Sequence, residues 1–114
     1  KGEVFWSMHR SDDGGVRRVE EPQVGSVDDL LAALGERGQR AVCLGDGAHR
    51  HADALLEGAD CSLMPVRHPS APTLVTVAVG RALREEWVDA DGVAPLYLRR
   101  PDAEINWETR EVRA

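Results

Sequence analysis

The residues of this chain best suited to chemistry lie in a short glycine-flanked turn, Gly45, Asp46 and Gly47. The turn follows an apolar run and precedes a segment with helical spacing. Glycine lets the backbone approach a nucleotide closely, and a helix start favours its phosphates. No lysine of a phosphate-binding loop follows the turn. We therefore interpret the turn first as structural and, alternatively, as a nucleotide contact.

The sequence patterns that would indicate hydrolysis or metal binding are weaker than the pattern of this turn. His49 and His51 are two residues apart, so a helix would not place both rings on one face. The sequence has no zinc-peptidase pair of histidines and no glycine elbow around a serine. Paired carboxylates such as Asp12 with Asp13 are typical of solvated surface. The sequence thus predicts no catalytic residue, no metal site and no cofactor.

A second candidate site is the apolar run that contains Tyr97 and Arg99. An extended segment with an aromatic ring and an arginine can dock on a partner. The alternative is that Leu96 and Leu98 pack in the core and leave Tyr97 partly exposed.

Four strands would position these residues. Alternating apolar residues predict a strand over residues 3–10, and a turn rich in aspartate and glycine predicts a returning strand over residues 16–24. Short apolar runs predict buried strands over residues 41–44 and 61–66. Residues 95–98 are expected to be extended.

Three helices are expected between the strands. Ser26 is the N-cap of the first, which ends near Gly38 and places a leucine-rich stripe towards the core. A short helix is expected over residues 48–56. Residues 73–79 favour a strand by propensity, but Ser70 as a cap and the shared apolar face predict a helix over about 70–87.

Composition narrows the class of protein. The chain has 114 residues, a net charge of −6 and two cysteines, which indicate one globular domain with reduced thiols in a cytoplasmic setting. No apolar run approaches the length needed to span a membrane. An acidic chain repels phosphate backbones, so we expect any contact with nucleic acid to come from a local basic patch or through a partner.

Four segments resemble, in the correct order, motifs of the bacterial TsaB (YeaZ) family, once labelled glycoproteases of the peptidase M22 family. They are residues 1–7 (KGEVFWS), 42–48 (VCLGDGA), 68–71 (HPSA) and 93–104 (VAPLYLRRPDAE). The resemblance covers nearly the whole chain but only the second half of the family's usual length.

The resemblance implies an α/β fold, namely one lobe of an actin-like ATPase (ribonuclease-H-like) fold with a mixed sheet packed by helices. It assigns residues 1–101 to a C-terminal lobe and residues 102–114 to a polar tail. The family has a further strand before the first hairpin. Without it, we expect an open sheet edge along residues 3–10 that can recruit another chain.

The function implied is that of a non-catalytic scaffold and activator. It would serve the complex that makes threonylcarbamoyladenosine in tRNA, with a TsaD-type catalytic subunit and a TsaE-type ATPase as partners. One alternative is a degenerate actin-like domain that binds or hydrolyses nucleotide through Asp46. Another is a small protein-interaction module of unrelated origin. The oligomeric state is left open, with a homodimer among the alternatives.

Overall fold

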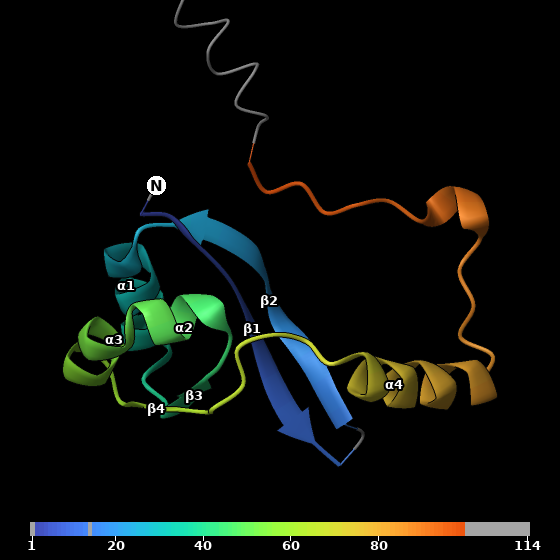
Figure 1. The fold of residues 1–114 in the computed structure, drawn as a ribbon, viewed down its shortest axis with the longest axis horizontal. Helices are drawn as coiled ribbons and strands as arrows, with labels where there is room; N and C mark the ends of the chain where they lie inside the picture. Colours follow the sequence, from blue (N-terminus) through green and yellow to red (C-terminus); the bar gives the residue numbers. More distant parts are fainter. Residues whose placement is uncertain (1, 14, 100–114) are drawn as a thin grey trace, which may run out of the picture. The chain divides into compact units, whose positions relative to one another are not determined.

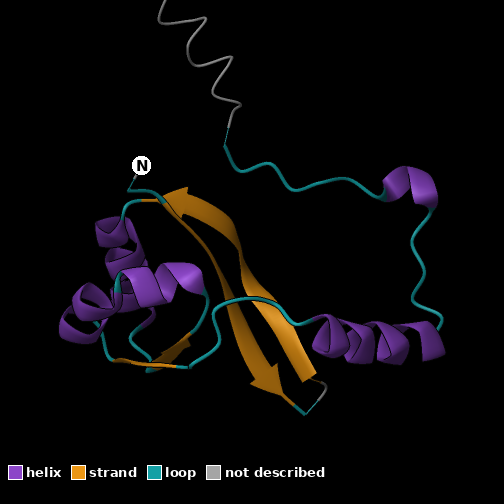
Figure 2. Ribbon diagram, viewed as in Figure 1, coloured by secondary structure: helices purple, strands orange, loops and turns teal. Residues whose placement is uncertain are grey.

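The computed structural model describes residues 2–13 and 15–99. The chain divides into two compact units. The first comprises Gly25–Ala94 with the N-terminal residues through Val4, and the second comprises Phe5–Val24 with the chain from Pro95 onward. The described part is a small mixed α/β protein with two separate two-stranded sheets and several helices (Figures 1 and 2).

An antiparallel hairpin forms most of the second unit. It pairs β1 (Val4–Asp12) with β2 (Gly15–Gly25), which confirms the two strands predicted here. Within the described residues β2 is the only strand that pairs with β1. Arg17 Nε lies 3.2 Å from an Asp12 carboxylate oxygen, and both side chains are largely exposed, so this ion pair adds little stability.

A βαβ crossover forms the centre of the first unit. β3 (Ala41–Cys43) and β4 (Cys61–Leu63) are parallel, with Ala41 opposite Cys61. Parallel neighbours require a long connection, and here α2 (Asp46–Arg50) and α3 (Ala52–Gly58) supply it (Figure 1). The ladder continues beyond the strands, because Met64 N–H donates to the Cys43 carbonyl at 2.9 Å.

Helix α1 (Val27–Arg37) begins and ends where the sequence predicts. The Ser26 hydroxyl accepts from the Asp29 N–H at 3.1 Å, while the Asp29 carboxylate accepts from the Ser26 N–H at 2.8 Å. These two bonds form a capping box. At the other end Gly38 adopts φ 59°, the left-handed conformation that glycine favours.

The core of the first unit is small and lies between the crossover helices and their neighbours. It consists of four buried apolar residues: Val4, Leu30, Ala48 and Leu55. Leu55 is fully buried. A Cβ built on Gly58 would lie 2.9 Å from Cδ2 of Leu31, so the absent side chain lets α3 approach α1.

Helix α4 (Ala71–Leu83) is also well capped, because the Ser70 hydroxyl accepts from the Thr73 N–H at 3.2 Å. None of its 13 residues is buried by the described part of the chain. After it the chain forms a short 3-10 helix, η1 (Ala90–Gly92), which the sequence did not predict. None of the helices in residues 2–13 and 15–99 has the length and apolar character needed to cross a membrane.

Four sequence predictions need correction. The mixed sheet is found as two separate sheets. The helix expected over residues 48–56 is two helices, because His51 leaves helical geometry at φ −111° and ψ 28°. The strand expected over residues 61–66 ends at Leu63.

The helix expected over residues 70–87 ends at Leu83, because Glu85 has φ 57°. The N–H groups of Glu85 and Glu86 donate back to the carbonyls of Ala82 and Arg81 at 3.0 and 3.1 Å. These two hydrogen bonds form the pattern of a Schellman motif, which here contains no glycine.

Candidate functional site

The turn formed by Gly45, Asp46 and Gly47 lies between β3 and α2, as the sequence predicts. Gly45 adopts φ 101° and ψ 168°, a region that side chains disfavour. Its N–H donates to the Val66 carbonyl at 2.7 Å. This amide is therefore already used by the chain and is not directed at a ligand.

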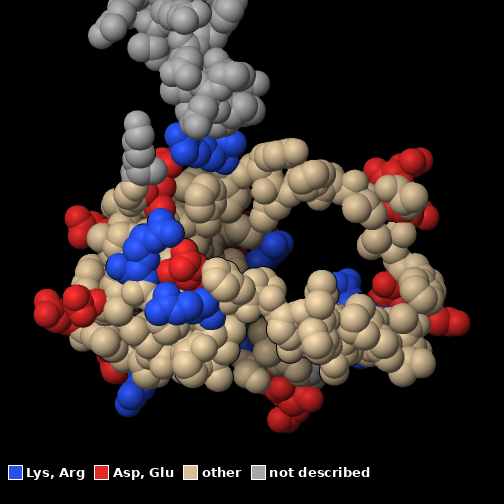
Figure 3. All heavy atoms as spheres, in the orientation of Figure 1, with Lys and Arg blue, Asp and Glu red and all other residues tan. Residues whose placement is uncertain are grey.

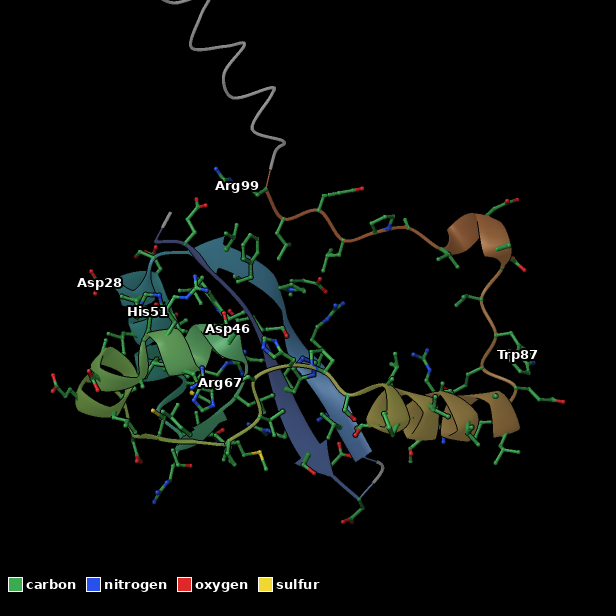
Figure 4. The ribbon with its side chains drawn as sticks, viewed as in Figure 1. Asp28, Asp46, His51, Arg67, Trp87 and Arg99 are labelled. Atoms are coloured by element: carbon green, nitrogen blue, oxygen red, sulfur yellow. The ribbon has the colours of Figure 1, made fainter. Side chains whose placement is uncertain are left out.

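Asp46 places a carboxylate in the first turn of α2, where the helix dipole favours a negative charge. It also accepts from Arg50 Nη2 at 2.9 Å across one turn of helix. An incoming phosphate at this turn would meet that carboxylate first. Figure 4 shows Asp46 and His51 at the two ends of α2 and Arg67 on the segment after β4.

Gly47 has a packing reason to be glycine. A Cβ at this position would lie 3.2 Å from Cγ1 of the buried Val4, closer than an ordinary contact. Both glycines of the turn thus meet a need of the fold, one for its backbone angle and one for space. The geometry accounts for the motif without a nucleotide.

The two histidines near the turn, His49 and His51, do not form a common site. His49 Nε2 lies 2.8 Å from the Met64 carbonyl, so this nitrogen carries the proton and donates. His51 is half-buried at the junction of α2 and α3. Within residues 2–13 and 15–99, no three His, Cys, Asp or Glu side chains are arranged to hold a metal ion.

The two cysteines lie next to each other on β3 and β4. Burial, and then the neighbouring Cys61 thiol, raise the pKa of Cys43 to about 11. The Cys61 thiol donates to the Leu55 carbonyl at 3.3 Å. A thiol with a raised pKa stays protonated at neutral pH and is a poor nucleophile or metal ligand. Both thiols are free and half-buried.

Tyr97 and Arg99, the candidate docking residues, belong to the second unit. The Tyr97 ring is 80% exposed. Leu96 is also exposed, so the expectation that it packs in the core is wrong. Trp87 is 72% exposed and points outward after α4 (Figure 4).

Helix α4 carries the apolar surface that the sequence reasoning missed. The large side chains on its apolar face are 51% to 80% exposed. On the face shown in Figure 3, few charged atoms interrupt the tan surface along α4. We call this face the α4 stripe; it consists of Leu74, Val75, Ala78, Val79, Ala82 and Leu83.

Nothing in the sequence of α4 distinguishes a buried stripe from an exposed one. The i, i+4 spacing that signals an amphipathic helix gives its apolar side but does not say what covers it. A comparison of the whole chain with known protein families and with curated protein sequences finds no match.

Proposed function

We propose that this chain is a non-catalytic scaffold lobe of the TsaB type, with the actin-like fold of that family. It would act with a TsaD-type catalytic subunit and a TsaE-type ATPase in making threonylcarbamoyladenosine in tRNA, in the cytoplasm. In this role it holds partners in place, contacts tRNA only indirectly, and contributes no reacting group, metal or peptidase activity.

The observation that carries the proposal is where the four family-like motifs lie. The first contains the start of β1, and the second runs from β3 through the Gly45–Gly47 turn. The third includes the Ser70 cap of α4, and the described part of the fourth, residues 93–99, follows η1. The first three motifs thus fall at a strand start, a turn and a cap, where backbone geometry restricts the residue type.

The exposed apolar surface supports a role in assembly. Within the first unit, large apolar side chains are exposed from Leu74 to Val93, and extended apolar surface of this kind marks interaction sites in soluble proteins. Asp46 is paired with Arg50 and the Cys43 thiol is held protonated. Neither group is set up as a nucleophile or general base.

A chimera tests the proposal. The C-terminal half of a TsaB family protein is replaced by this chain and expressed in a strain that lacks TsaB. We expect the chimera to restore threonylcarbamoyladenosine in tRNA, measured by mass spectrometry of nucleosides. A Tyr97→Ala chimera should lower the restored level, because it removes an exposed aromatic from the proposed docking segment.

Leu96→Ala is the matched control, since Leu96 is exposed beside Tyr97 and is not a proposed contact. A chimera that is soluble and binds neither partner would contradict the proposal. Equal effects of the two substitutions would remove Tyr97 from the docking site while leaving the scaffold role in place.

An interaction module of unrelated origin is the second candidate, and the exposed α4 stripe favours it. The chimera separates the two, because an unrelated module would leave the tRNA unmodified and would not associate with the TsaD-type subunit.

A further inference from the structure

We draw no further inference here: the strongest candidate, the exposed α4 stripe, is an unpartnered apolar helix face, and nothing in the described part of the chain shows what covers it.

Discussion

Helices α3 and α4 have similar apolar residues but differ in what covers them. Leu55 of α3 is fully buried, whereas no residue of α4 is buried by the described part of the chain. Yet α4 is the longer and better capped of the two, since α3 has no side-chain cap. The comparison teaches that caps decide where a helix begins, while burial decides whether it stabilises the fold.

The largest expected effect is a loss of stability on substituting the buried leucine of α3. Leu55→Ala should lower the free energy of unfolding by about 2–5 kcal/mol, because it opens a cavity at the one fully buried large side chain among the described residues. Chemical denaturation followed by circular dichroism measures it. Leu56→Ala, next in the sequence but 52% exposed, should cost under about 1 kcal/mol; equal losses would contradict the burial described for α3.

Removing each serine N-cap tests whether α1 and α4 contribute differently to stability. Ser26→Ala should cost about 1 kcal/mol of global stability, because α1 packs on α3 and contributes the buried Leu30. Ser70→Ala removes the same kind of bond from α4. It should increase amide exchange in α4 without shifting the denaturation midpoint of the buried core around Leu55, and a shared shift would show that α4 unfolds together with that core.

Replacing a glycine by alanine within a helix should have a smaller effect on stability, and it should stabilise rather than destabilise. A Cβ at Gly35 of α1 would meet no atom within 4 Å, so Gly35→Ala should stabilise the first unit by roughly 0.5–1 kcal/mol. Gly80→Ala in α4 should raise helix content by circular dichroism but leave the denaturation midpoint of the buried core around Leu55 unchanged. A destabilising Gly35→Ala would indicate that another group occupies the space beside this helix.

The smallest effect is a pH dependence confined to α1. Hydrogen bonds from the Ser26 side chain and backbone lower the pKa of Asp29. Its contribution to stability is therefore present above the unfolded value of about 3.9 and is lost as the pH falls through the lower folded value. The corresponding position in α4 is Thr73, which does not titrate.

Amide exchange of α1 and α4 between about pH 5 and pH 3 measures the difference. After correction for intrinsic exchange, α1 should lose protection on acidification, and Asp29→Asn should reduce that loss. Equal pH dependence in the parent and in Asp29→Asn would show that other carboxylates control the acid response of α1.

Local signals in the sequence predicted much of the secondary structure. Ser26 and Ser70 were identified as caps because their hydroxyl groups can satisfy free N–H groups at a helix start. The alternation in residues 3–10 and the apolar run at 41–44 gave two strands correctly. The candidate turn at Gly45, Asp46 and Gly47 also lies where a strand end was expected.

The features that the sequence could not predict depend on long-range packing, or on changes of backbone conformation that no residue type signals. His51 interrupts a helical segment without a glycine or proline to signal it. The separation of the strands into two sheets depends on which strands pair, which no local pattern determines. The reason for Gly47 became clear only from its distance to Val4, more than 40 positions earlier in the chain.

The reversal at Glu85 also determines which side chains can share a face with α4. If the helix continued for another turn, Glu86 would follow Val79 and Ala82 at i+7 and i+4, and its carboxylate would lie among the apolar side chains. The left-handed residue turns the chain before this happens. The same acidic group instead holds Arg81 and Arg84 beside the helix. A single backbone angle thus keeps a charge out of the exposed apolar face of α4.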